Sequence, residues 1–223
     1  MSNGKLIVLD GIDGCGKSTQ FEIMTRKLRA MGIPMQPVSF PEYDKPSAAL
    51  VKMYLGGDFS DVPGGVNAYA ASSFYAVDRI ASYKLYWEEA YQRGEVILAS
   101  RYTTSNAIHQ MGKLPKEEWD AYLAWLEDYE YNKLGLPKPD CVILLSLPLE
   151  VSQKLLMNRY DGDAEKKDIH ESDLAYLQQC RISAAYAAEK MGWKVVDCSD
   201  GEHIRSVESI HEELLGLFRE VIA

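Results

Sequence analysis

Cysteines are scarce in this sequence and stand far apart. Among its 223 residues there are four, at positions 15, 141, 180 and 198. No two of them form a C-x-x-C pair, which excludes the common cysteine-rich metal clusters and argues against a disulfide framework. Four separate thiols suit a reducing environment, so we expect a cytoplasmic protein.

Long hydrophobic runs are also missing. The longest, from Cys141 to Leu149, is broken by Ser146 and Pro148 and falls well short of the roughly 20 apolar residues that span a bilayer. The segment before the first apolar run, Met1–Lys5, lacks the hydrophobic core of a secretory signal. We therefore expect neither a membrane partner nor secretion.

Positive charge is in short supply as well. Lysine and arginine number 24 against 33 acidic residues, which gives a formal net charge of −9. A protein that binds a nucleic-acid polymer needs a basic face, so this balance argues against such a partner. Small phosphorylated ligands stay compatible, because a few local cations and backbone N–H groups hold them.

Apolar residues, by contrast, are plentiful enough for a large core. They make up 47% of the chain, which argues against general disorder. The sequence shows no internal repeat and no long linker rich in proline, glycine or serine. We therefore predict one domain over residues 1–223.

Short apolar runs alternate with longer amphipathic stretches. The runs predict five strands, at 6–9, 35–40, 96–99, 141–145 and 194–198. The stretches between them predict helices near 21–31, 66–91, 116–132, 149–159, 172–191 and 207–221. This alternation indicates right-handed βαβ crossovers and hence a three-layer α/β/α fold with a five-stranded parallel sheet. Ligands of such a sheet bind beyond the carboxyl ends of its strands.

A phosphate-binding pattern follows the first predicted strand directly. The segment from Gly11 to Ser18 reads G-I-D-G-C-G-K-S and matches G-x-x-x-x-G-K-[ST]. Its glycines let backbone N–H groups turn toward phosphate oxygens, Lys17 supplies a charge for the β- and γ-phosphates, and Ser18 offers a hydroxyl to Mg²⁺. We therefore predict that ATP and Mg²⁺ bind here. The predicted contacts are Gly11, Asp13, Gly14, Cys15, Gly16, Lys17, Ser18 and Thr19.

A phosphate loop does not by itself separate kinases from GTPases. The guanine-binding motif N-K-x-D is not seen, since residues 132–135 read N-K-L-G. Four segments instead resemble the thymidylate kinase family of P-loop nucleoside-monophosphate kinases: L-D-G-I-D-G-C-G-K-S-T at 9–19, F-P-E-Y at 40–43, F-Y-A-V-D-R at 74–79 and S-R-Y-T-T-S-N-A-I-H-Q at 100–110. The resemblance covers nearly the whole chain. It implies ATP-dependent phosphorylation of dTMP to dTDP by a homodimer.

The resemblance also implies roles for single residues. Tyr75 and Arg79 are four apart and share a helix face, and the family implies that Tyr75 stacks on the base while Arg79 bonds the base's edge. Arg101 is implied to contact the phosphates, and Asp13 to accept from the sugar 3′-hydroxyl. Asn106 carries both a donor and an acceptor and is suited to read a pyrimidine edge. The predicted substrate site is completed by Tyr43, Ser105, His109 and Gln110.

Structural roles are the alternatives for these residues. Tyr75 is then a core ring, Arg79 belongs to a surface ion pair, Arg101 forms a structural salt bridge, and Asn106 caps a helix.

A polar, charged segment at 159–171 resembles the lid of the same family. Phosphoryl transfer needs cations along the transferring group and exclusion of water, and Arg159, Lys166 or Lys167 would supply the cations. Arg159 therefore joins Lys17, Arg101 and Asp13 as a predicted catalytic residue. A solvated connector between helices is the alternative.

Three positions depart from the family pattern. Ser100 stands where the family has an acid linked to Mg²⁺, so we expect Ser18 and ordered waters to hold the ion. Glu42 stands near the place of an arginine that holds the acceptor phosphate, and Lys45 is a candidate substitute. Gly14 replaces an arginine found in one branch, which shifts the catalytic cation toward the lid. Two alternatives follow: a kinase for another nucleoside monophosphate, or a nucleotide-binding protein with weak or lost transfer activity.

Overall fold

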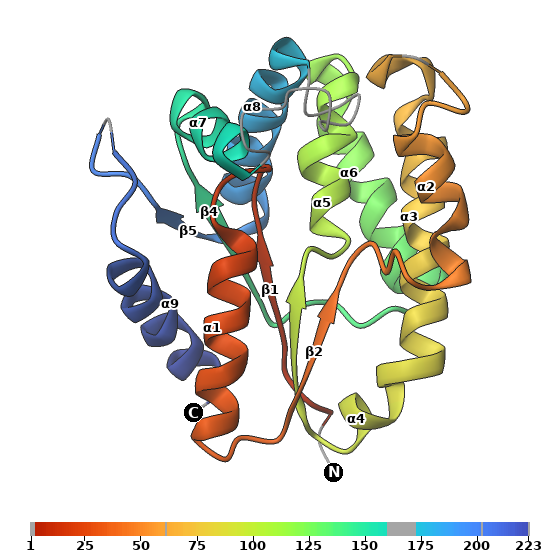
Figure 1. The fold of residues 1–223 in the computed structure, drawn as a ribbon. Coiled ribbons are helices and arrows are strands. Elements are labelled where there is room, and N and C mark those ends of the chain that lie inside the picture. The colour runs from red at the N-terminus through yellow and green to blue at the C-terminus, as the bar shows by residue number, and fades with distance from the viewer. Residues whose placement is uncertain (1–2, 61, 160–172, 202, 223) are drawn as a thin grey trace.

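The computed structural model describes residues 3–60, 62–159, 173–201 and 203–222. Its centre is a sheet of five parallel strands in the order β2-β3-β1-β4-β5 (Figure 1). The strands are β1 (Leu6–Asp10), β2 (Met35–Ser39), β3 (Val96–Ser100), β4 (Cys141–Ser146) and β5 (Lys194–Asp197). Each lies where the sequence predicts a strand, so the predicted five-stranded parallel sheet is confirmed.

The register of the sheet brings distant parts of the chain to one edge. In the central strand β1, Leu9 lies opposite Ser100 of β3, and Asp10 lies opposite Leu144 of β4. The strands therefore end nearly level with one another. The loop after β1 and the segment after β3 consequently meet at the carboxyl edge, which is where such sheets bind ligands.

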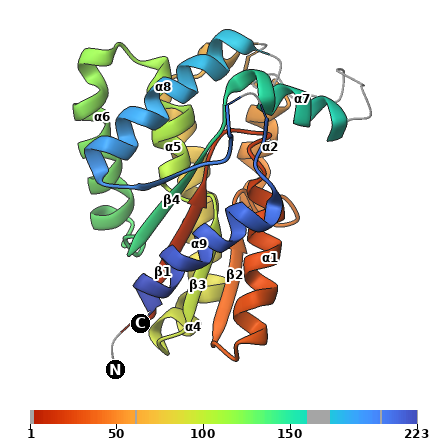
Figure 2. The same cartoon turned by 90° about the vertical axis from the view of Figure 1, so that its left-hand side faces the viewer.

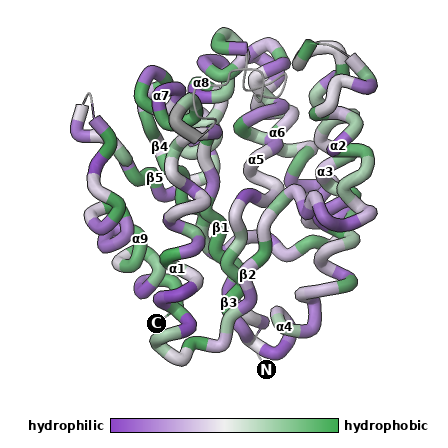
Figure 3. Tube along the Cα trace, in the orientation of Figure 1, coloured by the Kyte–Doolittle hydropathy of each residue, from purple (hydrophilic) through white to green (hydrophobic). Residues whose placement is uncertain are grey.

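One face of the sheet is covered by α1 (Lys17–Ala30) and α9 (Val207–Ile222). Ile7 and Leu9 pack with residues of both helices. Figure 2 shows α9 running obliquely in front of the strands, with its upper end beside α1. Full burial of an aliphatic side chain contributes about 1.5–3 kcal/mol, so this layer is a large part of the core. Figure 3 shows the apolar positions gathered along the central strands.

The opposite face receives Leu6 and Val8 from β1 and is covered by a second layer of helices. These are α3 (Ala68–Ser82), α5 (Thr104–His109), α6 (Trp119–Glu127) and α8 (Leu174–Met191). Two π-helical turns, η3 (Tyr83–Trp87) and η6 (Asp128–Lys133), extend α3 and α6, and α4 (Glu88–Gln92) follows η3. The predicted three-layer α/β/α fold is thus confirmed.

Shorter elements complete the description. Helices α2 (Ala49–Leu55) and α7 (Leu149–Arg159) stand near the carboxyl ends of the strands (Figure 1). Helical periodicity in the sequence does not predict α2 or α5, because seven and six residues are too few to establish a period. The remaining turns are the 3-10 helices η1 (Pro46–Ala48), η2 (Pro63–Gly65), η4 (Met111–Lys113) and η5 (Lys116–Glu118). No helix in the described part of the chain combines the length and apolarity needed to cross a membrane.

Candidate active site

The phosphate-binding loop connects β1 to α1 at the carboxyl edge of the sheet. Its glycines at positions 11, 14 and 16 have positive φ angles of 151°, 79° and 84°. A side chain at Gly14 would also collide with α7, since an added Cβ would lie 2.5 Å from the Ser152 carbonyl oxygen. Glycine is therefore required at position 14 both for the backbone angle and for the close approach of α7.

Lys17 and Ser18 begin α1 at the end of this loop. The Lys17 side chain is buried, and its Nζ donates to the Gly11 carbonyl oxygen at 3.2 Å, so the ammonium group lies against the loop. Ser18 is exposed, and the first turn of the helix contains no acidic residue. A helix N-terminus presents N–H groups and a partial positive charge to an anion. The loop, the lysine and the helix end thus present N–H groups and positive charge at one place.

A cavity of about 440 Å³ opens beside the loop, a volume typical of small-ligand sites. Its wall comes from the loop, from the segments after β2 and β3, and from α3, α5 and α8. Most predicted site residues meet here, namely Asp13, Gly14, Cys15, Lys17, Ser18, Tyr43, Tyr75, Arg79, Arg101, Ser105, Asn106, His109 and Gln110. Three other predicted contacts, Gly11, Gly16 and Thr19, belong to the loop or to α1 and lie outside the wall.

Arg101 connects several charged groups of the cavity. Its guanidinium forms an ion pair with Asp13, and its Nη1 lies 3.8 Å from the Asp10 carboxylate. Burial acts to raise the pKa of the Asp13 carboxyl, but the charges of Arg101 and Lys17 outweigh burial and hold that pKa well below its ordinary value. Asp13 is therefore an ionised hydrogen-bond acceptor at neutral pH.

The backbone of Arg101 is strained. Its φ angle is 64°, in the left-handed region that costs a non-glycine residue about 1–3 kcal/mol. The chain is held there because the Arg101 N–H donates to the Leu9 carbonyl oxygen of β1 at 2.9 Å. The side chain also bonds His109 Nε2 at 2.9 Å. A guanidinium only donates, so this imidazole nitrogen is the acceptor of the bond.

Sequence reasoning did not single out Asp10, which is fully buried at the end of β1. Its carboxylate accepts from the Thr104 hydroxyl at 2.6 Å, from the Ser105 hydroxyl at 2.8 and 2.9 Å, and from the Gly11 N–H at 2.8 Å. These bonds fasten the beginning of α5 to β1 and so orient the cavity residues on that helix. An acid that ends an otherwise apolar strand at the ligand-binding edge is the signal that marks it.

Lys45 does not reach the cavity as a substitute for the missing arginine. Its Nζ lies 4.5 Å from the centre of the Tyr86 ring, and it is not part of the wall. Glu42 accepts a hydrogen bond from the Ser82 hydroxyl at 2.5 Å and also stays outside the wall, whereas Tyr43 lines it. In the part of the chain that the structure describes, the lysine and arginine side chains of the wall are Lys17, Arg79 and Arg101.

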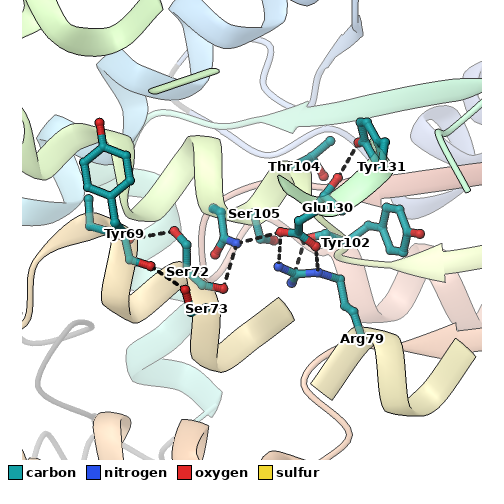
Figure 4. A network of polar contacts seen from close by, with 12 residues as sticks. Tyr69, Ser72, Ser73, Arg79, Tyr102, Thr104, Ser105, Glu130 and Tyr131 are labelled. Carbon is teal, nitrogen blue, oxygen red and sulfur yellow. Dashed lines mark hydrogen bonds and ion pairs between the residues drawn. The ribbon is translucent and has the colours of Figure 1, made fainter. Parts of the chain in front are cut away.

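Arg79 lines the cavity and is held from behind by a buried carboxylate. Its Nε and Nη2 donate to Glu130 at 2.7 and 2.5 Å, and its Nη1 donates to the Tyr102 carbonyl oxygen at 3.3 Å (Figure 4). Asn106 donates to the same carboxylate at 3.1 Å. The structural alternative for Arg79 was a surface ion pair. Arg79 does form an ion pair, with Glu130, but this pair is buried and Arg79 also lines the cavity. Nothing in the sequence distinguishes Glu130 from its acidic neighbours.

Tyrosines form part of the same wall. Tyr75 lies one helical turn before Arg79, and both line the cavity, as their spacing predicts. The ring of Tyr54 on α2 meets the Tyr75 ring edge-on, with 6.2 Å between centroids. On the far side, the Tyr176 hydroxyl of α8 donates to the His109 carbonyl oxygen at 2.8 Å. Tyr176 is thus a further wall residue that the sequence analysis did not name.

The oxygen donors beside the loop suit Mg²⁺. The hydroxyls of Ser18 and Ser100 and the carboxylate of Asp13 line the cavity. Within the described ranges, no three His, Cys, Asp or Glu side chains are grouped so as to hold a metal by themselves. Mg²⁺ keeps several waters and is commonly bound through one or two protein oxygens and substrate phosphates, so this sparse set fits it.

Most of the predicted lid lies outside the described residues. Arg159 is the last residue of α7, and Lys166 and Lys167 fall in the segment 160–172. The roles assigned to these cations therefore stay predictions.

The arrangement defines a class of enzyme. Many nucleoside triphosphatases share the phosphate loop, but here the cavity beside the loop is also lined by the guanidinium of Arg101 and by the ring of Tyr75. Transfer between two nucleotides requires this juxtaposition of donor and acceptor, because catalysis of phosphoryl transfer is mostly positioning and charge stabilisation. The fold and the site are those of a P-loop nucleoside-monophosphate kinase.

Comparison with known proteins narrows the class. The family model described as thymidylate kinase matches residues 9–213. A thymidylate kinase of Mycobacterium tuberculosis is 33% identical over 192 residues, which cover 84% of this chain and 87% of that protein. A human thymidylate kinase is 28% identical over 222 residues, 98% of this chain and 92% of that one. The chain therefore belongs to the thymidylate kinase family.

A solved structure has the same fold. It is a thymidylate kinase from Candida albicans, similar with a TM-score of 0.72 over 99% of this chain and 93% of that chain. Sequence identity between the two is 19%, so this likeness concerns the fold alone.

Proposed function

We propose that the protein transfers the γ-phosphoryl group of ATP to dTMP, forming dTDP and ADP for dTTP synthesis. One observation carries the proposal: Lys17 of the phosphate loop and Tyr75, Arg79 and Arg101 line the same cavity. A donor on the loop and an acceptor in the cavity would therefore meet at the loop's mouth. Family membership supports dTMP as the acceptor.

The acceptor's parts match the chemistry of the wall. In this proposal the base stacks on Tyr75, and such stacking is worth about 1–3 kcal/mol. The ionised Asp13 accepts from the sugar 3′-hydroxyl, and Arg101 forks the acceptor phosphate. Ser105, His109, Gln110 and Tyr43 border the sugar and the base.

The transfer itself needs little from the protein beyond position and charge. A phosphate monoester is already mostly ionised near neutral pH, so no general base is required for its oxygen to attack the γ-phosphorus in line. Lys17 and Arg101 are assigned to the charge that develops on the transferring group. Mg²⁺, bound through Ser18 and water, would neutralise charge on the β- and γ-phosphates.

Charge balance supports a role for further cations. In the described part of the site, Lys17, Arg79 and Arg101 stand against three carboxylates, those of Asp10, Asp13 and Glu130. The formal charge of these six groups is zero, while two nucleotides bring several negative charges. We therefore assign the remaining compensation to Mg²⁺ and to the lid cations Arg159, Lys166 and Lys167.

A coupled ADP-release assay tests the proposal directly. ATP·Mg²⁺ is offered with dTMP, dUMP, UMP, CMP, AMP and GMP in parallel. We expect turnover with dTMP above dUMP and far above the others. Preference for another monophosphate would keep the kinase mechanism and overturn the acceptor. Measurable ATP binding without turnover on any acceptor would indicate a nucleotide-binding protein instead.

We also propose that the protein is a cytoplasmic homodimer. Large apolar side chains are exposed along α3 and η3, where Val77 is 45%, Tyr86 44% and Leu85 69% accessible. Such clustering is typical of a surface that a partner covers, and a second copy packed helix against helix would bury it. The four cysteines are free, which agrees with a reducing compartment.

A further inference from the structure

The Asn106 amide beside Arg79 has only one orientation that satisfies its neighbours. Its Nδ2 lies 3.1 Å from Glu130 Oε1 and 3.4 Å from the Ser72 carbonyl oxygen. A carboxylate and a carbonyl oxygen only accept hydrogen bonds, so the NH₂ group has to face them both. The side chain is 2% exposed, and a reversed amide would place its oxygen against two acceptors without water to separate them.

This orientation decides what Asn106 offers to a ligand. Both N–H donors are directed at protein acceptors, and none of the residues that the structure describes donates to Oδ1. Asn106 also lines the cavity. The group available to a bound base is therefore the amide oxygen, which is an acceptor.

Arg79 presents the opposite polarity. Glu130 takes its Nε and Nη2 donors, and the Tyr102 carbonyl oxygen takes one donor of Nη1. A guanidinium has five N–H groups, so two donors remain, and Arg79 lines the cavity. The cavity thus holds an acceptor and a donor from neighbouring elements, both anchored on one carboxylate.

We propose that Glu130 is the positioning residue that fixes this acceptor–donor pair and thereby makes the cavity select an imide base edge over an amidine edge. Thymine and uracil present an N3–H donor and an O4 acceptor, which complement Asn106 Oδ1 and Arg79. Cytosine presents an N3 acceptor and an N4 amino donor, which meet like groups at both positions. A site whose buried polar groups are left unpaired discriminates strongly.

The location of Glu130 explains why a carboxylate is needed. It lies on η6, is fully buried, and pairs with Arg79 (Figure 4). It also accepts from Asn106, and its own side chain is not part of the cavity wall. An isolated charge at that depth would be costly, and Arg79 offsets it. Glu130 Oε1 accepts from both Arg79 Nη2 and Asn106, and its Oε2 accepts from Arg79 Nε, so three donors share two oxygens. A neutral amide has one oxygen for these three donors and would turn its NH₂ group toward at least one of them, which loosens the pair.

The inference rests on the proposed function, since it concerns the acceptor of that same site. The test is the variant Glu130→Gln, and the matched control is Glu127→Gln, the same change one helical turn earlier. The Glu127 side chain is 37% exposed and pairs with Lys138, and neither residue is part of the cavity wall. Steady-state kinetics are measured with dTMP and dCMP, and dissociation constants for both are measured by calorimetry.

We expect the dTMP-to-dCMP ratio of kcat/KM to fall about tenfold or more in Glu130→Gln, mainly through a higher KM for dTMP. The KM for ATP should stay unchanged in Glu130→Gln. In the control variant Glu127→Gln, the dTMP-to-dCMP ratio should equal that of the wild type. In an Asn106→Ala background the effect of Glu130→Gln on this ratio should be smaller, because Asn106 is one of the two groups that Glu130 holds. An unchanged ratio in folded Glu130→Gln protein, or an equal loss for both acceptors, would overturn the proposal.

Two further measurements keep the outcomes separate. If Glu130→Gln does not fold, Glu130→Asp takes its place. Aspartate keeps a negative charge for Arg79, but its shorter side chain does not reach Asn106. The dTMP-to-dCMP ratio of kcat/KM should again fall. If the wild type binds dTMP without turning it over, the proposed function fails. The calorimetric ratio of dTMP to dCMP affinity then still decides whether Glu130 sets the polarity of the site.

Discussion

Lys17 supplies the positive charge of the phosphate loop. Its Nζ lies 3.2 Å from the Gly11 carbonyl oxygen, within the curve of the loop. Replacing it with alanine removes a charge from the β- and γ-phosphates without disturbing the core. We expect Lys17→Ala to lower kcat by two or more orders of magnitude while the thermal unfolding temperature changes little. Lys27→Ala, an exposed position on the same helix, is the control, and near-normal turnover of Lys17→Ala would refute the loop assignment.

Tyr75 carries the stacking assignment. Loss of its ring should weaken the acceptor by about 1–3 kcal/mol, so Tyr75→Ala is expected to raise the KM for dTMP about tenfold or more and the KM for ATP much less. Tyr75→Phe keeps the ring, so its KM for dTMP should be much closer to the wild-type value than that of Tyr75→Ala. Initial-rate kinetics with each substrate varied in turn check this, and equal effects on both KM values would remove Tyr75 from the acceptor site.

The Asp13–Arg101 pair links stability to acid pH. The folded-state pKa of Asp13 lies well below its ordinary value of 3.8, so the ionised pair stabilises the fold above about pH 4. As pH falls further, the unfolded chain takes up a proton that the folded chain does not, and this contribution is lost. The Asp13 side chain is 30% exposed, so solvent screens the pair, and we expect it to contribute about 1–2 kcal/mol to the free energy of unfolding at neutral pH.

Chemical unfolding of wild type and Asp13→Asn from pH 7 to pH 2.5 tests the linkage. The difference in free energy of unfolding between the two should shrink steadily below about pH 4. A difference that does not change with pH would show that the pair is not ionised as described.

At the scale of elements, the loop and α7 are packed against each other through Gly14. An added methyl group there would approach the Ser152 carbonyl oxygen to 2.5 Å and would have to adopt a φ of 79°. We expect Gly14→Ala to destabilise the protein by about 1–3 kcal/mol. It should also lower turnover, since the displaced loop no longer fits phosphate.

Gly216 on α9 is the matched comparison. An added Cβ there meets no atom within 4 Å, and the position is exposed within a helix. Gly216→Ala should therefore stabilise the protein by about 0.5–1 kcal/mol and leave turnover unchanged. Differential scanning calorimetry of both variants checks the two signs, and a destabilised Gly216→Ala would contradict the packing described for α9.

For the whole molecule, the prediction concerns assembly. If α3 and η3 form the interface of a homodimer, a charge at Val77 places an unpaired carboxylate among apolar groups. Sedimentation at micromolar concentration should then find Val77→Glu mostly monomeric and the wild type dimeric. Val195→Glu, which is 53% exposed on the edge strand β5, is the control and should leave assembly unchanged. A dimeric Val77→Glu would move the interface elsewhere.

Local patterns in the sequence determined the strands, most of the helices and the phosphate loop. Continuous apolar runs such as Leu6–Leu9 are strands because both faces of a parallel sheet are buried. The loop from Gly11 to Ser18 is identifiable because its chemistry lies in eight consecutive residues. The rule that such sheets bind ligands at the carboxyl ends of their strands also predicts that Asp13, after the first strand, and Arg101, after the third, share one edge.

Only the tertiary structure decided which side chains serve one another. Glu130 reaches Arg79 across 51 positions of the chain, and Asp10 receives Thr104 across 94. Lys45, close in sequence to the acceptor segment, instead lies over Tyr86. Periodicity and composition report on neighbours along a helix or strand, whereas these pairings depend on which elements pack together. Glu130 looks like its acidic neighbours in sequence, because its burial is a property of the fold.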